Sequence, residues 1–221
     1  MHSSSARWAA SGVTAPLVLA TRNAGKVREL RAFFMTHAMA VEDLASAGLR
    51  EDVAAEEAIE VFETFEANAR AKAHYFASRL PGRIVIADDS GLAVQALNGA
   101  PGVRSRRWSG RFDVTGPALD AANNAILLAS LRGVTDRRAR FVCVAAWCNG
   151  CDDVVARGEV EGRIIDEPRG MHGFGYDPHF HVEELGLTLA EATIAEKERV
   201  SHRGRAFRRL LELVRGACAS G

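Results

Sequence analysis

The stretch that most constrains the fold is residues 84–92, which read Ile-Val-Ile-Ala-Asp-Asp-Ser-Gly-Leu. The four apolar residues are typical of a buried strand, and they end at two carboxylates, a hydroxyl and a glycine. We expect such a strand to bring its acids to the edge of a sheet, where open α/β sheets bind ligands. Adjacent aspartates repel each other unless a cation or a hydrogen-bond donor relieves them, and Mg²⁺ prefers carboxylate oxygens together with substrate phosphates. The alternative is a turn, because Asp-Asp-Ser-Gly is also good turn chemistry.

The balance of charge limits the kinds of partner. The chain has 221 residues with 28 Lys and Arg against 28 Asp and Glu, so its net charge is close to zero. A chain of this length forms one large domain or two small ones. A neutral chain is a poor match for bulk binding to nucleic acid or to an anionic membrane, although a local basic patch can bind a small polyanion. We therefore expect neither a nucleic-acid nor a membrane partner.

The hydropathy pattern predicts the domain limits and the compartment. No apolar run approaches the ~20 residues that a transmembrane helix needs. Residues 1–15 are small and polar, and they lack the apolar middle of a signal peptide. We expect a disordered extension over residues 1–15, one two-lobed domain over residues 16–216, and a cytoplasmic location.

The cysteines and histidines give weak signals for a metal site. Cys148 and Cys151 have the C-x-x-C spacing of a zinc knuckle or a redox pair. A structural zinc site usually needs two such pairs or added histidines, and Asn-Gly between these cysteines suits a hairpin turn. His179 and His181 alternate on a predicted strand, and we expect them on a half-exposed surface.

A strand, a glycine-containing loop and a helix open the domain. Residues 17–21 are predicted as a short buried strand, residues 22–26 as a turn, and the helix follows with apolar residues at helical spacing. Such a loop points backbone N–H groups and the positive helix end at an anion. It is not a Walker A loop, because G-x-x-x-x-G-K-[ST] is missing. The alternative is an ordinary strand–helix connection.

A second helix is predicted from Thr64, which is a good N-cap, to the Pro-Gly pair at 81–82. Thr64, Asn68 and Lys72 share one of its faces. Its predicted buried stripe is Phe65, Ala69, Phe76 and Leu80. Further on, residues 118–131 are predicted as a helix, and residues 140–148 and 153–165 as the two strands of a hairpin.

Two segments near the C-terminus carry polar and aromatic groups that a plain scaffold does not need. Residues 170–178 hold three glycines among aromatics, which allows close backbone approach and offers a stacking face for a flat ring. Alternatively, this is a surface loop whose aromatics pack into the core. Ser201 is a good N-cap for the last helix, whose first turn carries His202 and Arg203. Cations there oppose the helix dipole, which favours a site.

Taken together, these stretches resemble the inosine/xanthosine triphosphate pyrophosphatase family (Ham1-like), from about residue 17 to about residue 214. The motifs occur in the order that the family has. They are T-R-N-A-G-K at 21–26, T-F-x-x-N-A-x-x-K-A at 64–73, A-D-D-S-G-L at 87–92 with G-A-P-G at 99–102, G-F-G-Y-D-P at 173–178, and S-H-R at 201–203.

The resemblance implies the fold and the chemistry. The implied fold is α/β, a mixed twisted sheet with flanking helices, in two lobes around a nucleotide cleft. The implied reaction is Mg²⁺-dependent hydrolysis of dITP, ITP or XTP to a monophosphate and pyrophosphate. The implied assembly is a homodimer.

The resemblance also implies roles for single residues. Asp89 is the expected metal ligand and general base, although the sequence does not choose between Asp88 and Asp89. Glu60 is the expected second metal ligand, with Glu63 as a rival. The residues expected at the polyphosphate are Thr21, Arg22, Asn23, Ala24, Gly25, Lys26, Lys72 as a catalytic group, and Ser90. The residues expected at the base are Phe174, Gly175, Tyr176, Asp177, Lys197, His202 and Arg203.

The chain departs from the family pattern in two places. Ala67 stands where the family usually has Glu, with Glu66 as a possible replacement, and Arg104 and Arg106 stand where Tyr and Ala are commoner. Three other functions remain open from the sequence. They are a Maf-like nucleotide pyrophosphatase of other specificity, a nucleotide sensor that no longer hydrolyses, and a zinc-knuckle nucleic-acid module.

Overall fold

The computed structural model describes residues 15–219, without the side chains of residues 57 and 217–219. All but the last residue of the predicted extension therefore lies outside the described residues, as does the side chain of Cys218. No helix in the described part of the chain is long and apolar enough to cross a membrane.

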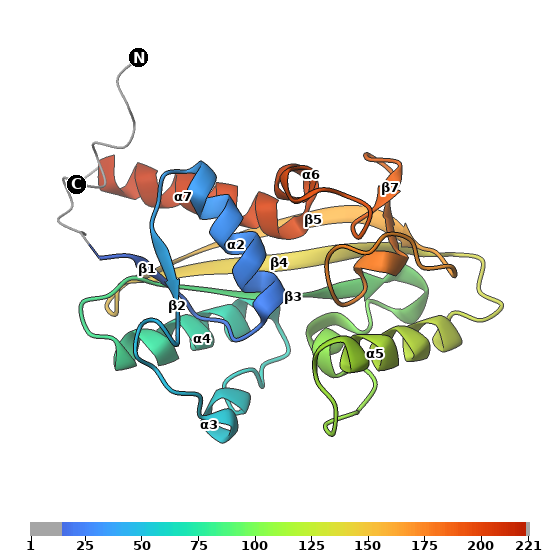
Figure 1. Cartoon of the computed structure of the whole chain (residues 1–221), viewed down its shortest axis with the longest axis horizontal. Helices are drawn as coiled ribbons and strands as arrows, with labels where there is room; N and C mark the ends of the chain where they lie inside the picture. The colour runs from blue at the N-terminus through green and yellow to red at the C-terminus, as the bar shows by residue number, and fades with distance from the viewer. Residues whose placement is uncertain (1–14, 220–221) are drawn as a thin grey trace, which may run out of the picture.

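A seven-stranded mixed sheet forms the centre of the molecule, with strand order β2-β1-β3-β4-β5-β6-β7. The strand β1 is parallel to both of its neighbours, and the remaining pairs are antiparallel. The strand bounds are β1 Leu17–Leu19, β2 Val41–Asp43, β3 Val85–Val94, β4 Arg138–Cys148, β5 Asp153–Ile164, β6 Phe180–Val182 and β7 Leu187–Thr188. The long strands β3, β4 and β5 run through both halves of the molecule (Figure 1).

Helices cover the sheet on both sides. In Figure 1, α7 lies above the long strands and α2 crosses in front of them, α4 and the short α3 lie below them, and α5 lies below the right half of β3. The helix bounds are α2 Ala24–Thr36, α3 Val53–Glu57, α4 Phe65–Arg79, α5 Gly116–Ser130, α6 Ile194–Val200 and α7 His202–Ala219. The 3₁₀ turns are η1 Gln95–Leu97, η2 Gly102–Arg107 and η3 Asp177–His179.

The buried apolar side chains form three clusters. One joins Ile86 and other residues of the first half of the sheet to α2 and α7, and a second joins Ala87 and its neighbours to α4. These two residues are adjacent on β3, so the clusters lie on opposite faces of one sheet. The third cluster, around Leu92 and Phe180, is the core of the other half. The half with β1, α2 and α4 is called the first lobe, and the half with α5 and the third cluster is called the second lobe. The predicted fold, a mixed sheet with flanking helices in two lobes, is confirmed.

The prediction that the strand stops at its acids is wrong, and so is the alternative of a turn. The strand β3 continues to Val94, and Asp88 and Asp89 pair with β4 in mid-ladder. The strand continues because Leu92 and Val94 are themselves fully buried, so an apolar anchor lies on each side of the acids. The two carboxylates therefore lie between the lobes and not at an outer edge.

Two smaller expectations have different outcomes. His179 and His181 are each 7% exposed, so the predicted half-exposed surface is wrong, because the turn η3 and the strand β6 pack into the third cluster. The residues between Cys148 and Cys151 do form the turn of the β4–β5 hairpin, with Gly150 at a φ of 95°.

Candidate active site

Asp88 is a buried carboxylate held by cations from two helices. Asp88 is 1% exposed. Its Oδ2 lies 2.9 Å from Nζ of Lys26 and 3.4 Å from Nε of Arg203. Lys26 belongs to the first turn of α2, and Arg203 to the first turn of α7. Burial opposes ionisation, but the charges of Lys26, Arg203 and Lys72 outweigh it and hold the pKa of Asp88 well below its ordinary value. Asp88 is therefore a permanent anion that orders the cations around it.

Asp89 faces the opposite side of β3, toward α4, because side chains alternate along a strand. Its Oδ2 accepts a hydrogen bond of 3.0 Å from Nδ2 of Asn68, and its Oδ1 accepts one of 2.9 Å from the Ser90 amide. Burial raises the pKa of Asp89 to about 6, and the negative charge of Glu60 adds to the rise. Each carboxylate oxygen has two acceptor sites, so both oxygens can still bind a cation or take a proton.

The segment before α4 brings Glu60 into the site and leaves Glu63 outside it. Glu60 forms an ion pair with Lys72, whose Nζ also donates a 3.0 Å hydrogen bond to a backbone carbonyl of β3. Burial opposes ionisation of Glu60, but the charge of Lys72 outweighs it and lowers the pKa of Glu60. The Glu63 side chain is 80% exposed and lies 3.5 Å from Arg104. Glu60 is thus the acid that the structure places near Asp89.

The loop before α2 forms a capped helix start. Oδ1 of Asn23 accepts a 3.0 Å hydrogen bond from the Lys26 amide, which makes Asn23 the N-cap. The amides of Ala24 and Gly25 lie in the same turn and have no acceptor among residues 15–219. Two N–H groups at the positive end of a helix are therefore open to an anion.

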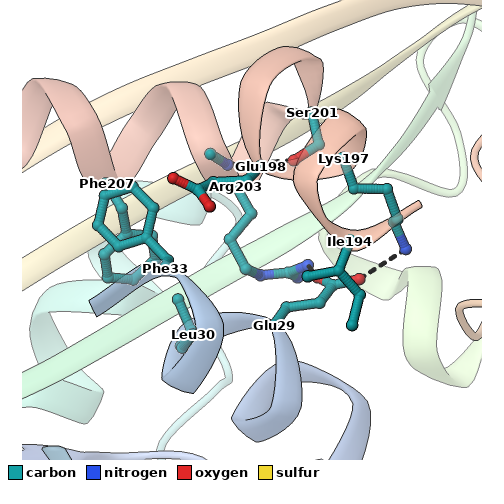
Figure 2. A pocket seen from close by; sticks show the side chains of 10 residues that line it. Glu29, Leu30, Phe33, Ile194, Lys197, Glu198, Ser201, Arg203 and Phe207 are labelled. Atoms are coloured by element: carbon teal, nitrogen blue, oxygen red, sulfur yellow. Dashed lines mark hydrogen bonds and ion pairs between the residues drawn. The ribbon is translucent and has the colours of Figure 1, made fainter. Parts of the chain in front are cut away.

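Glu29, one turn after Lys26 on α2, joins two cations that come from α6 and α7. Its Oε1 accepts a 2.6 Å hydrogen bond from Nζ of Lys197, and its Oε2 accepts one of 2.6 Å from Nη1 of Arg203. Both cations point at the Glu29 carboxylate, beside a small cavity of about 20 Å³ (Figure 2). Lys197 also lies 2.8 Å from Oδ2 of Asp177.

These ion pairs form one alternating chain of buried charges that ties α2 to β3, α7, α6 and η3. Burial opposes the charge of each member, but the neighbouring charges outweigh it for Glu29, whose pKa falls, and for Lys197 and Arg203, whose pKa values rise. The chain runs in the order Lys26, Asp88, Arg203, Glu29, Lys197, Asp177.

Phe174 packs against the start of α2. A Cβ on Gly25 would lie 2.3 Å from Cδ1 of the Phe174 ring, so a glycine is required at this contact. Nζ of Lys197 and Cζ of Arg203 lie 5.7 Å and 5.6 Å from the ring centroid, within the range of cation–π contacts. The Phe174 amide donates a 3.0 Å hydrogen bond to Asp177, which fixes the loop.

Gly175 and Tyr176 attach this loop to the second lobe. The Gly175 amide donates a 2.8 Å hydrogen bond to Asp120 of α5, and the Tyr176 hydroxyl donates one of 2.7 Å to the Ser105 carbonyl of η2. Tyr176 is 5% exposed and belongs to the third cluster. Its ring is therefore part of the core, as the alternative for this segment expects, while Phe174 remains near the charges.

The S-H-R segment places a neutral imidazole and a cation side by side. Oγ of Ser201 accepts a 3.1 Å hydrogen bond from the Gly204 amide, so Ser201 caps the start of α7 as predicted. His202 stacks on Phe141 with ring centroids 4.6 Å apart. Burial, with the charge of Arg203, lowers the pKa of His202 well below its ordinary value, so the ring is neutral. Nη2 of Arg203 donates a 2.9 Å hydrogen bond to Oγ of Ser90.

A cavity of about 170 Å³ lies beside the Glu60–Lys72 pair, between the two lobes. Its walls include Thr21, Arg22, Glu60 and Lys72 from the first lobe and Arg106 from η2. Arg22 is held at its wall by Glu56, 2.8 Å away. The cavity therefore connects the Lys72–Glu60 pair with a cationic second wall.

The structure gives a role to Glu29 and leaves Glu66 without the role that the sequence suggested. Glu29 is not singled out by the sequence, and the one available signal is its position three residues after Lys26 on a helix whose other inward positions are apolar. Glu66 lies in an exposed i,i+4 ion pair with Arg70, 3.0 Å apart, so its position does not support the suggestion that it replaces the Glu missing at Ala67.

Comparison with known proteins identifies the family of the chain. A family model described as the Ham1 family matches residues 17–213. The chain belongs to the Ham1 family. The resemblance predicted from the motifs is thereby confirmed.

Similar proteins carry a common enzymatic name. The dITP/XTP pyrophosphatase of Burkholderia pseudomallei is 47% identical over 198 residues, which cover 88% of this chain and 91% of that protein. The protein of the same name from Mycolicibacterium paratuberculosis is 49% identical over 199 residues, which cover 89% and 94%. The solved Ham1 protein of Staphylococcus aureus has a TM-score of 0.75 at 37% identity, and the match covers 92% of this chain and 100% of that one.

Proposed function

We propose that this Ham1-family chain hydrolyses deaminated purine nucleoside triphosphates, dITP, ITP and XTP, between the α and β phosphates. Water attacks the α-phosphorus, the bond from that phosphorus to the bridging oxygen breaks, and pyrophosphate leaves with a nucleoside monophosphate as the other product. Relatives at 47% and 49% identity over nearly the whole chain are named dITP/XTP pyrophosphatases, which supports the reaction and the substrates. The consequence in the cell is removal of non-standard nucleotides from the pool.

The observation that carries this proposal is the position of Asp89, a buried acid that faces α4, accepts hydrogen bonds from Asn68 and the Ser90 amide, and lies by the Glu60–Lys72 pair. Burial and the charge of Glu60 raise the pKa of Asp89 to about 6. A general base works best when its pKa lies near the pH at which the enzyme operates. Asp88, the neighbouring acid, is already paired with Lys26 and Arg203, so it is a poor proton acceptor. Asp89 is therefore the group that orients the attacking water and takes its proton.

The residues at this point suit a Mg²⁺ ion. The charge of Glu60 raises the cost of ionising Asp89, and both carboxylates offer the hard oxygen ligands that Mg²⁺ prefers. No group of three or more His, Cys, Asp or Glu in the described part of the chain forms a ready-made cage. Mg²⁺ is commonly held by one or two carboxylates with substrate phosphates completing the shell. When bound, it would neutralise phosphate charge at the reacting centre.

The polyphosphate is bound from the α2 side. The Ala24 and Gly25 amides and the helix dipole attract a phosphate group, with Thr21 to Lys26 forming its cradle. Lys72, whose charge Glu60 and the β3 aspartates hold in place, stabilises charge that develops during bond cleavage. Ser90, which already accepts a hydrogen bond from Arg203, completes the contact with substrate.

The purine is selected by hydrogen-bond donors beside Phe174. Hypoxanthine and xanthine carry a 6-keto oxygen, whereas adenine carries a 6-amino donor. Lys197 and Arg203 supply N–H groups near the ring of Phe174, on which a flat base can stack, and His202 precedes Arg203 in the same helix start. A donor aimed at O6 accepts the first two bases and meets a second donor in ATP, and such a mismatch is strongly rejected because buried polar groups stay unpaired.

The proposal includes a homodimer in the cytoplasm. Cys143, Cys148 and Cys151 are free thiols, as is usual in a reducing compartment. Light scattering of the purified protein should give twice the mass of one chain.

Product analysis with purified protein, Mg²⁺ and separate dITP, XTP, ATP, GTP and dUTP tests the proposal. The expected result is monophosphate and pyrophosphate from dITP and XTP, little turnover of the other three, and loss of turnover in Asp89→Asn. Orthophosphate as the released product would contradict the cleavage position. Preference for dUTP would support a Maf-like specificity, and binding of dITP without turnover would support a sensor.

A further inference from the structure

Arg106 lines the 170 Å³ cavity and, unlike Arg22 and Arg111 there, has no carboxylate partner among the described residues. Arg22 pairs with Glu56 at 2.8 Å, and Arg111 pairs with Asp113 at 2.6 Å. The Arg106 guanidinium has no hydrogen-bond or ion-pair partner within the part of the chain that the structure describes.

The backbone around Arg106 is held firmly even though its side chain is not. Its carbonyl accepts a 3.0 Å hydrogen bond from Nδ2 of Asn123, a buried side chain of α5. The preceding residue, Ser105, accepts a 2.8 Å hydrogen bond from the Leu92 amide of β3 and donates one of 2.6 Å to the Gly102 carbonyl. A guanidinium that has no partner among the described side chains therefore projects from a fixed point on the second lobe.

The first lobe alone supplies little uncompensated positive charge to a polyphosphate. Lys26 is paired with Asp88, and Lys72 is paired with Glu60. The charge of Arg106 already acts on Glu60 and helps to lower the pKa of that acid, so the guanidinium is close enough to act on the Glu60–Lys72 pair from its own wall of the cavity.

The position of the cavity indicates which part of a nucleotide Arg106 would reach. The cavity wall includes Thr21, Glu60 and Lys72, and it includes none of Phe174, Lys197 and Arg203. Groups that recognise a base therefore lie elsewhere, and the cavity faces the phosphate end. A guanidinium suits this end because its planar fork binds phosphate oxygens in pairs.

We propose that Arg106 binds the pyrophosphate leaving group from the second lobe, opposite Lys72, and so completes the polyphosphate site across the cleft. This inference rests on the proposed function for the identity of the ligand. It adds a substrate-binding residue from η2 that carries uncompensated charge, whereas the cations of the first lobe are shared with carboxylates.

Calorimetric titration of the full chain with inorganic pyrophosphate in Mg²⁺ buffer tests this, with inosine monophosphate as the second probe. Arg106→Ala should weaken pyrophosphate binding about tenfold or more, because hydrogen bonds to charged groups are worth roughly that factor. Arg106→Lys should recover part of the loss, since it keeps the charge without the fork. Binding of inosine monophosphate should change less than about twofold.

Arg104→Ala is the matched control, because Arg104 lies on the same turn, has a side chain that is 71% exposed, pairs with Glu63 and does not line the cavity. If pyrophosphate binding weakens equally in both variants, the effect comes from the overall positive charge of the turn, and the proposal is overturned. Unchanged pyrophosphate binding in Arg106→Ala, or no pyrophosphate binding by the unmodified protein, would also overturn it. Failure of the proposed function is separate, because it is read from the products of dITP and not from these affinities.

Discussion

Nζ of Lys26 and Oδ2 of Asp88 lie 2.9 Å apart and join the first turn of α2 to the middle of β3. Asp88 also holds Arg203, so one carboxylate neutralises cations from both helices on that face. Asp89, its neighbour, makes no such pair and is instead close to another acid, Glu60. The pKa values of these adjacent residues are therefore shifted in opposite directions, down for Asp88 and up for Asp89.

This contrast predicts opposite stability changes in two conservative variants. Asp88→Asn should lower the free energy of unfolding by about 3 kcal/mol, because removing one partner leaves buried cations uncompensated. Asp89→Asn should raise it by about 1 kcal/mol at pH 7, because the ionised Asp89 is disfavoured in the folded state. Urea unfolding without Mg²⁺ measures both. Similar losses in the two variants would contradict the assignment.

The pH dependence follows from the same group. The pKa of Asp89 is about 6 in the folded protein against 3.8 ordinarily, so the folded state binds this proton more tightly than the unfolded chain does. The stabilisation is complete below pH 3.8 and is lost as the pH rises to about 6. The difference in stability between the unmodified protein and Asp89→Asn should change across this window and be constant above it.

Activity should follow the same titration in the opposite sense. A general base must be ionised, so kcat/KM should fall as the pH drops below about 6. Higher Mg²⁺ should move this limb to lower pH, because a nearby cation favours the carboxylate. A limb that stays fixed at every Mg²⁺ concentration would argue that the metal does not contact Asp89.

The pair Glu60 and Glu63 gives a matched test of the metal site. Glu60→Gln should raise the Mg²⁺ concentration needed for half-maximal activity at least about tenfold, as loss of groups around a metal commonly does. Glu63→Gln should change it less than about twofold, because that side chain is 80% exposed and pairs with Arg104. Magnesium titrations of dITP turnover measure both variants, and a larger effect of Glu63→Gln would reverse the choice between them.

The starts of the helices could be predicted from the sequence, because the residues next to a helix start decide where it begins. Thr64 caps α4 and Ser201 caps α7 as expected, since a hydroxyl before an apolar periodic run satisfies the first amides of a helix wherever the helix lies. The strand through Asp88 is predicted too short, because Leu92 and Val94 reveal their burial only once the second lobe packs on them.

The charge network could not be predicted in the same way. Glu29 and Lys197 are far apart in the sequence, and their 2.6 Å contact depends on how α2 and α6 pack. Whether Arg106 faces a cavity or solvent likewise depends on the tertiary position of η2. Neither the hydrophobic periodicity nor the spacing of motifs in the sequence predicts that position. The motifs identify which residues gather, whereas packing decides which of them are already neutralised.

The contact between Gly25 and Phe174 gives the last prediction. Alanine normally stabilises a helix by about 0.5–1 kcal/mol relative to glycine. At Gly25 a Cβ would lie 2.3 Å from the Phe174 ring, so Gly25→Ala must displace the ring and should gain no stability. Because an aromatic stacking contact is worth up to about 1.5 kcal/mol, KM for dITP should rise about tenfold.

Gly216→Ala is the control for that prediction, since Gly216 also lies in a helix and its Cβ would meet no atom of the described residues within 4 Å. This variant should raise the free energy of unfolding by about 0.5–1 kcal/mol and leave KM unchanged. Urea unfolding and steady-state kinetics of the two variants separate helix propensity from the Phe174 contact. If Gly25→Ala behaves like Gly216→Ala in both assays, the ring of Phe174 moves freely and does not define the face on which the purine stacks.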